Sequence, residues 1–182
     1  MISGDVAAVI VILLRTLIPL TIFRFPLLGG ILAMLADALD VMMFNGFGAG
    51  FLDNVPYQIF DKTFDIYYLS IEFFVMRKWV DKLAKKAGSI LYSWRLIGFV
   101  LFVITGIEEM FLYAPNIFEF FFLAMLIIWK FDKKFRLNGK RLIVILLIVG
   151  IPNIIKEYIM HFAFKDQTWD FIRDNFFWWM YN

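Results

Sequence analysis

The chain has 182 residues, of which 62% are hydrophobic and 20% aromatic, whereas soluble domains are roughly 45–50% apolar. It contains no cysteine, which excludes disulfides, thiolate catalysis and cysteine-ligated metal or iron–sulfur centres. The formal net charge is only +2, and the charges are strongly segregated along the chain. The composition therefore predicts an integral membrane protein whose main partner is the lipid bilayer, and we expect no nucleic acid partner.

A membrane-spanning helix needs about 20 mostly apolar residues. The segments of this kind are Val6–Phe23, Leu27–Phe44, Tyr57–Met76, Tyr92–Tyr113, Asn116–Trp129 and Leu142–Phe162. We predict an all-α fold, a polytopic transmembrane helical bundle with six spans over residues 1–163. The first apolar segment has no basic leader and no small-residue cleavage site, so we expect it to be retained as a span. The aromatic tail, residues 164–182, is expected to lie at the membrane interface.

The basic residues of the predicted connections lie on one side of this path. Arg77–Lys86 and Lys130–Arg141 are rich in lysine and arginine, whereas Asn45–Pro56 and the predicted turn at Ala114–Pro115 are not. Cytoplasmic loops of membrane proteins carry an excess of basic residues. We therefore expect a multi-pass protein of the plasma (inner) membrane, with the basic loops cytoplasmic and both termini extracytoplasmic.

The third predicted span carries its polar residues on one face. Asp61, Asp65, Tyr68 and Glu72 are spaced by four, three and four residues, so they share one side of a helix. An acid that faces lipid costs several kcal/mol. This face must therefore point into the bundle or into a water-filled cavity, and Lys62 beside it supplies a positive charge.

Two further aspartates end the second predicted span. Asp37 and Asp40 are three residues apart, and up-and-down threading brings them to the same end of the bundle as Asp61 and Asp65. At about 1.5 Å per residue, Arg15 of the first span reaches a similar depth, so it is expected to pair with Asp37 or Asp65. The four aspartates are the predicted cation site.

Other polar residues fall within or at the ends of the predicted spans and are expected to support this site. They are Arg15, Lys62, Glu72, Arg95, Glu108, Glu109, Asn116, Glu119, Asn153, Lys156, Glu157 and His161. We expect Lys156 to pair with Glu108 or Glu157, and Pro152 to kink the last span. The acids of the spans outnumber the fixed positive charges, and such an excess cannot remain ionised at low dielectric. Either several acids are protonated or a cation occupies the site.

These features predict a membrane protein with a buried acidic cavity that binds a cation or protons, with transport as the activity such a cavity would serve. Six helices without an internal repeat are a small frame for alternating access, so a homo-oligomer is expected in that case. The alternative is a structural membrane subunit, in which the same charges form interhelical ion pairs and hydrogen bonds that set the packing.

The spacing Asp37-x2-Asp40 followed by Asp61-x3-Asp65 resembles the signature of the CDP-alcohol phosphatidyltransferase family. The resemblance implies a six-helix membrane enzyme in which aspartates hold two divalent metal ions, such as Mg²⁺, against a CDP-linked diphosphate. It implies that Asp37, Asp40 and Asp61 are metal ligands and that Asp65 is both a ligand and the catalytic base. A divalent-metal-dependent, CDP-alcohol phosphatidyltransferase-like enzyme is therefore the second functional hypothesis.

Two other stretches resemble segments of six-helix bacterial membrane proteins. They are Asp61–Leu69, with the pattern DK-x-x-D-x-YYL, and Pro115–Glu119, with the pattern PN-x-FE. This resemblance implies no activity.

Overall fold

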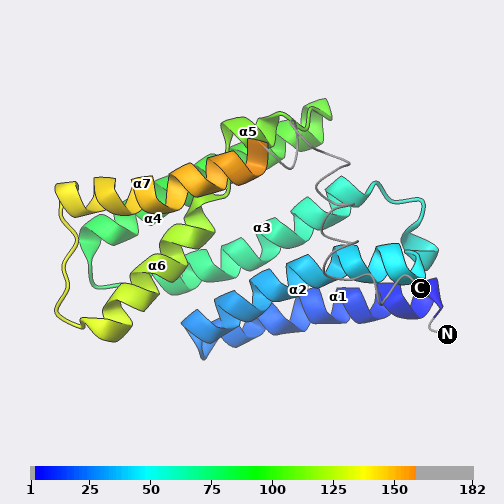
Figure 1. Ribbon diagram of the computed structural model, residues 1–182, viewed down its shortest axis with the longest axis horizontal. Helices are drawn as coiled ribbons and strands as arrows, with labels where there is room; N and C mark the ends of the chain where they lie inside the picture. The colour runs from blue at the N-terminus through cyan, green and yellow to red at the C-terminus, as the bar shows by residue number, and fades with distance from the viewer. Residues whose placement is uncertain (1–2, 159–182) are drawn as a thin grey trace.

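The computed structural model describes residues 3–158, and every regular element in that range is helical. Figure 1 shows the arrangement. The elements are α1 (Gly4–Leu20), η1 (Thr21–Phe23), α2 (Pro26–Phe47), η2 (Gly50–Leu52), α3 (Tyr57–Met76), α4 (Lys82–Thr105), α5 (Met110–Tyr113), α6 (Ile117–Phe131) and α7 (Gly139–Tyr158), where η marks a short 3₁₀ helix. The predicted end of the last span, His161, the tail at 164–182 and the side chain of Glu157 lie outside the described residues.

Four helical stretches in the described part of the chain are long and apolar enough to cross a membrane. They are Gly4–Phe23, Pro26–Phe47, Lys82–Thr105 and Met110–Phe131. Helix α3 has 20 residues, but Asp61, Lys62, Asp65 and Glu72 lie within it. The predictions of an all-helical fold and of several helices long and apolar enough to cross a membrane are thus confirmed for the described residues.

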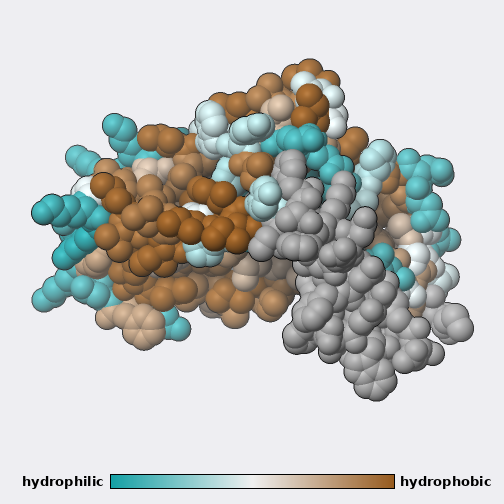
Figure 2. Space-filling model, turned by 45° about the horizontal axis from the view of Figure 1, so that its top comes forward, coloured by the Kyte–Doolittle hydropathy of each residue, from teal (hydrophilic) through white to brown (hydrophobic). Residues whose placement is uncertain are grey.

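The long helices run roughly parallel or antiparallel to one another along the longest dimension of the molecule (Figure 1). Helix α1 packs along α2, α3 contacts α4, and α6 packs against α2, α4 and α7. The α3–α4 and α6–α7 connections lie at one end, while the N-terminus and the α2–α3 connection lie at the other. Figure 2 shows hydrophilic residues at the end with the α3–α4 and α6–α7 connections and hydrophobic residues along the sides. This distribution is the one expected of a bundle whose sides face lipid.

Small residues are buried on both α1 and α2, which pack along each other. Ala7 and Ala8 of α1 are fully buried, and Gly29, Ala33 and Ala36 of α2 are buried as well. Small side chains at membrane-helix interfaces let two backbones approach closely. The close approach brings the larger polar side chains of the same two faces into contact with each other.

Helix α6 lies in the middle of the packing. Phe121 and Phe122 are adjacent in the sequence, and both are fully buried. Phe122 belongs to the hydrophobic cluster around Leu69 of α3, whereas Phe121 belongs to the cluster around Ala84 of α4. Helix α6 therefore joins the two hydrophobic clusters.

The predicted fourth span, Tyr92–Tyr113, has the wrong bounds at both ends. Helix α4 starts at Lys82, because the Asp81 side chain accepts hydrogen bonds from the backbone N–H groups of Leu83 and Ala84, each at 3.0 Å. It ends at Thr105, because Gly106 adopts a left-handed conformation with φ 70° that favours glycine and terminates helices. The lysines assigned to a loop are thus the first turns of the helix.

The chain then folds back along α4. The Trp94 indole N–H donates to the carbonyl oxygen of Tyr113 at 2.8 Å, and the Arg95 guanidinium donates to that of Ala114 at 2.9 Å. The chain does break at Ala114–Pro115, between α5 and α6, but Ala114 is only 3% exposed, so this break is buried, and its predicted extracytoplasmic location stays a prediction. Side chains of α4 satisfy the backbone carbonyls of the break, as a buried backbone requires.

Candidate functional site

Arg15 of α1 lies at the centre of four carboxylates. Its Nη2 atom is 2.5 Å from Asp37 Oδ1 and 2.9 Å from Asp65 Oδ1, and its Nη1 atom is 2.9 Å from Asp61 Oδ1. Nη1 also pairs with Asp40 Oδ2. The side chain of Arg15 is 2% exposed, so the guanidinium is shielded from water and its contacts are with four carboxylates instead. The prediction that Arg15 pairs with Asp37 or Asp65 is confirmed for both of them.

Two further basic side chains complete this aspartate cluster. Lys62 Nζ lies 2.7 Å from Asp61 Oδ2 and 3.2 Å from Asp65 Oδ2, and Arg95 Nη2 lies 3.7 Å from Asp65 Oδ2. Arg95 is 1% exposed, and the ring centroid of Phe111 lies 4.7 Å from its guanidinium carbon and 5.6 Å from Lys62 Nζ. Four acidic and three basic groups leave one negative charge when all of them are ionised.

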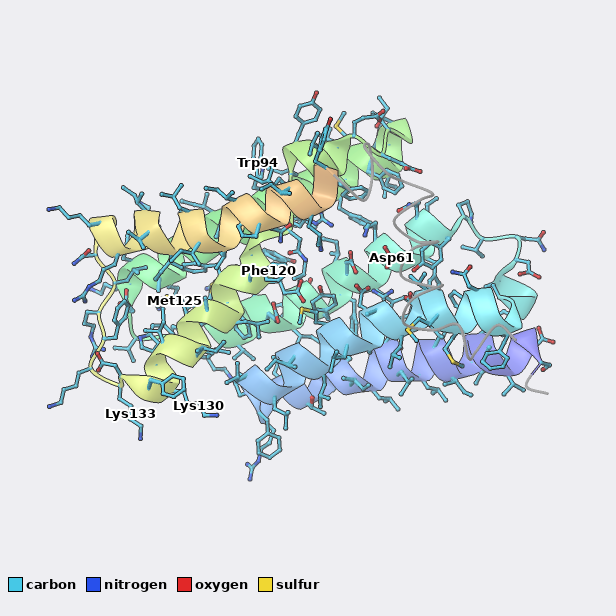
Figure 3. The ribbon with its side chains drawn as sticks, in the orientation of Figure 1. Asp61, Trp94, Phe120, Met125, Lys130 and Lys133 are labelled. Atoms are coloured by element: carbon cyan, nitrogen blue, oxygen red, sulfur yellow. The ribbon has the colours of Figure 1, made fainter. Side chains whose placement is uncertain are left out.

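Four helices position these groups, with Arg15 on α1 and Arg95 on α4. Asp37 and Asp40 belong to α2, one turn apart, and Asp61 and Asp65 belong to α3. The expected polar face of α3 is confirmed, since Asp61, Asp65, Tyr68 and Glu72 are all buried. Figure 3 shows Asp61 toward the end of the molecule opposite to Lys130 and Lys133. The aspartate cluster thus lies away from the basic connections.

One side chain that hydrogen-bonds to the aspartate cluster was not among the predicted site residues. The Tyr57 hydroxyl donates a hydrogen bond of 2.7 Å to Asp40 Oδ1. Tyr57 precedes Asp61 by four residues on α3, so the helical spacing that links Asp61 to Asp65 could have identified it. Phe111 offers no comparable signal, because it reaches the cluster through the unpredicted return of the chain along α4.

Three of the aspartates are also placed to hold a metal ion. Asp37, Asp61 and Asp65 each offer one carboxylate oxygen, and these oxygens lie within 4.8 Å of one another. Carboxylate oxygens are the ligands that hard cations prefer. The Arg15 guanidinium already pairs with all three, so a metal ion would have to share or displace it. The Asp37 side chain is 36% exposed whereas that of Asp40 is 0% exposed, which makes Asp37 the accessible side of the cluster.

A second buried polar group lies where α6 begins. The Asn116 amide donates to Glu119 Oε2 at 2.8 Å, and the Asn153 amide of α7 donates to the Asn116 backbone oxygen at 2.7 Å. Glu72 of α3 is 0% exposed. The network expected from the sequence is therefore divided into the aspartate cluster and this inner group.

The remaining predicted residues lie elsewhere. Glu108 and Glu109 are in the turn that follows α4, and Glu109 is exposed. Lys156 Nζ lies 5.7 Å from the centroid of the Phe120 ring. Its proposed partner Glu157 has no described side chain, so that pairing stays a prediction.

Comparison of the chain with protein-family models, with curated proteins and with solved structures finds no match.

Proposed function

We propose that this chain is a multi-pass membrane protein that binds a single cation, a proton or a monovalent metal ion, at the aspartate cluster. The observation that carries the proposal is the charge balance of that cluster. Asp40, Asp61 and Asp65 are buried and Asp37 is partly exposed. Among residues 3–158, the basic partners of these four carboxylates are Arg15, Lys62 and Arg95, so one negative charge is uncompensated. A charge in a low-dielectric interior is costly unless it is paired, and one bound cation removes that cost.

The same balance favours one positive charge over two. A divalent ion added to the intact cluster would leave an excess positive charge next to Arg15, which already pairs with the oxygens that a metal would use. A proton shared between two carboxylates requires no such displacement.

We further propose that α3 and α7 also span the bilayer, which gives six spans, with the basic connections in the cytoplasm of a cell bounded by a plasma (inner) membrane. This topology is supported by the position of the basic connections at one end of the molecule (Figure 1). It is also supported by the burial of the acidic face of α3, which leaves apolar side chains such as Phe74 on the exposed face of that helix.

The test is cation binding by the purified protein in detergent. We expect the melting temperature to rise with NaCl or with lowered pH, relative to choline chloride at equal ionic strength, and Asp65→Asn to abolish that rise. Asp53→Asn is the matched control, because Asp53 is an exposed aspartate next to η2. A melting temperature that responds to neither cation nor pH, together with a lower value for Asp65→Asn, would show that the cluster is structural.

A phosphatidyltransferase-like enzyme is the second candidate, favoured by the metal-binding geometry of Asp37, Asp61 and Asp65. Against it, Val41 and Tyr57 stand where the signature of that family has glycines, and the Tyr57 side chain is bonded to Asp40. Release of CMP from CDP-diacylglycerol in the presence of Mn²⁺ or Mg²⁺, lost in Asp65→Asn, would establish this activity. Absence of CMP release, together with cation-dependent melting, would leave the cation-binding function.

A further inference from the structure

Glu72 is a buried acid without a hydrogen-bond partner. It is 0% exposed, and neither carboxylate oxygen has a hydrogen-bond partner among the described residues. A Cβ atom added at Gly30 of α2 would lie 3.0 Å from Glu72 Oε1 and 2.9 Å from Leu123 Cδ2 of α6. The carboxylate of Glu72 is therefore held between α2 and α6, and the missing side chain at Gly30 gives it room.

Glu119 is the acidic residue of α6 on this side of the helix. It lies one turn before Leu123, in the first turn of α6, and it is 3% exposed. Its Oε2 atom accepts a hydrogen bond from Asn116, whereas its Oε1 atom has no partner among the described residues. The N-terminal end of a helix favours a negative charge, so Glu119 is the better placed of the two acids to remain ionised.

The charged neighbours of the two acids differ. Among residues 3–158, the charged group that acts on Glu72 is Glu119. Glu119 interacts in addition with Asp65 and Tyr68 of α3, Arg95 of α4 and Lys156 of α7. Tyr68 of α3 also interacts electrostatically with Glu72, but a phenol is neutral near pH 7. No base in the described part of the chain thus compensates Glu72.

From this arrangement we infer that Glu72 carries a proton and is a neutral carboxylic acid, whereas Glu119 keeps its charge. Glu72 thus forms a second, inner proton site, held between α2 and α6. A neutral carboxylic acid solves the problem of an unpaired carboxylate in the membrane interior. This site is separate from the aspartate cluster and does not depend on the function proposed for it.

Infrared spectroscopy of the purified protein tests the inference. A protonated carboxylic acid has a C=O stretching band that is distinct from that of a carboxylate. We expect such a band in the wild type near neutral pH, its loss in Glu72→Gln and a shifted frequency in Glu119→Gln, because that substitution removes the charge that acts on Glu72. Glu109→Gln is the matched control, since Glu109 is exposed, and it should leave the band unchanged. Spectra of the two buried variants identical to that of the wild type would overturn the inference.

A second measurement separates a proton from a bound metal ion. An apolar carbodiimide reacts with protonated acids: the proton moves to a carbodiimide nitrogen while the carboxylate oxygen bonds to the central carbon. We expect a covalent adduct on Glu72, mapped by mass spectrometry, that added Na⁺ or Mg²⁺ does not suppress. We also expect Glu72→Gln to melt no lower than the wild type, because glutamine mimics the neutral acid. Suppression of the adduct by a metal ion, together with loss of metal-dependent stability in Glu72→Gln, would overturn the inference and identify a metal site.

Both readouts are independent of Asp65→Asn. Failure of the aspartate-cluster hypothesis therefore leaves the Glu72 band and adduct as they are, and their absence leaves cation binding by the aspartates untouched.

Discussion

Arg15 occupies the position that a metal ion would take among acidic side chains. Its planar guanidinium presents several donors in fixed directions, and they meet carboxylates from two different helices. A lysine in the same place would be a single point charge that could not bridge as many oxygens in fixed geometry. The residue thus both neutralises the aspartates and ties α1 to α2 and α3.

Arg15→Gln should therefore be strongly destabilising. Removal of one partner from a buried ion pair typically costs about 3–5 kcal/mol, because the remaining charge is left uncompensated. We expect a large drop in melting temperature in detergent, measured by the unfolding of the purified variant. Arg24→Gln removes an exposed arginine and should change the melting temperature little. Equal effects of the two substitutions would contradict the central role of Arg15.

The same variant tests the metal-binding geometry. Without Arg15, the oxygens of Asp37, Asp61 and Asp65 that lie within 4.8 Å of one another become free for a divalent cation. We expect Mn²⁺ to raise the melting temperature of Arg15→Gln and to leave the wild type unchanged. Stabilisation of the wild type by Mn²⁺ would show instead that Arg15 and a metal ion share the site.

The aspartate cluster could be predicted from the sequence to a useful extent. Helical spacing and span order brought together Asp37, Asp40, Asp61, Asp65 and Arg15, because both depend on short-range geometry. Arg95 was different. A long side chain near the middle of a helix can reach toward the interface or stay inside. Its buried position depends on the Ala114 carbonyl and the Phe111 ring, which arrive from a segment whose path the sequence did not reveal.

The start of α4 depends on a single side chain. Asp81 Oδ1 accepts from two backbone N–H groups of α4, and Asp81 Oδ2 accepts from the Leu137 N–H at 2.7 Å. One carboxylate therefore caps the helix and attaches the α6–α7 connection to it. We expect Asp81→Ala to cost about 2 kcal/mol, at the upper end of the range for an N-cap, measured by chemical or thermal unfolding.

Asp132→Ala provides the matched control for the cap. Asp132 is an exposed aspartate that accepts one local hydrogen bond from the Lys134 N–H at 2.9 Å. Its removal should cost about 0.5 kcal/mol or less, as surface substitutions usually do. A loss for Asp132→Ala as large as that for Asp81→Ala would show that the link between the two connections is not what stabilises them.

Glycine at position 29 sets the distance between α2 and η1, the short helix that follows α1. A Cβ atom there would lie 2.6 Å from the Ile22 backbone nitrogen and 2.8 Å from its Cα atom. Backbone cannot move aside as a side-chain tip can, so we expect Gly29→Ala to cost about 1–3 kcal/mol through overpacking. Gly139→Ala has no neighbour within 4 Å and should be tolerated in the same unfolding assay. Tolerance of both substitutions would contradict the close packing of α1, η1 and α2.

Helix boundaries could be predicted where a change in hydropathy coincides with the helix end. Helix α3 has the predicted bounds Tyr57–Met76, since Pro56 and the basic residues after Met76 mark both ends. For the predicted fourth span, by contrast, both the start and the end were predicted wrongly. The lysines at its start are helix formers despite their charge, and the apolar residues after Gly106 continue the hydrophobic pattern although the backbone has already turned.

At the scale of the whole molecule, polar groups are distributed along the helix direction. The basic connections lie at one end, and the aspartate cluster lies toward the other, as the positions of Lys133 and Asp61 show (Figure 3). A bilayer around the apolar sides would separate the two groups. An acid cluster near the side opposite the basic loops is reached by cations from the outside of the cell if the positive-inside rule holds.

The access of cations to the aspartate cluster therefore depends on which side of the membrane the α2–α3 connection faces. The chain is suited to measuring this by cysteine labelling, because it contains no native cysteine. Asn54→Cys and Lys133→Cys each place one thiol at an exposed position, on the α2–α3 and α6–α7 connections respectively. In intact cells we expect a membrane-impermeant maleimide to label the first variant, and to label the second only after the cells are opened.

The reverse pattern would place the aspartates on the cytoplasmic side, where CDP-linked lipids present their nucleotides, and would make the phosphatidyltransferase-like function the stronger hypothesis. Labelling of both in intact cells would contradict a bundle that separates the two connections by a membrane.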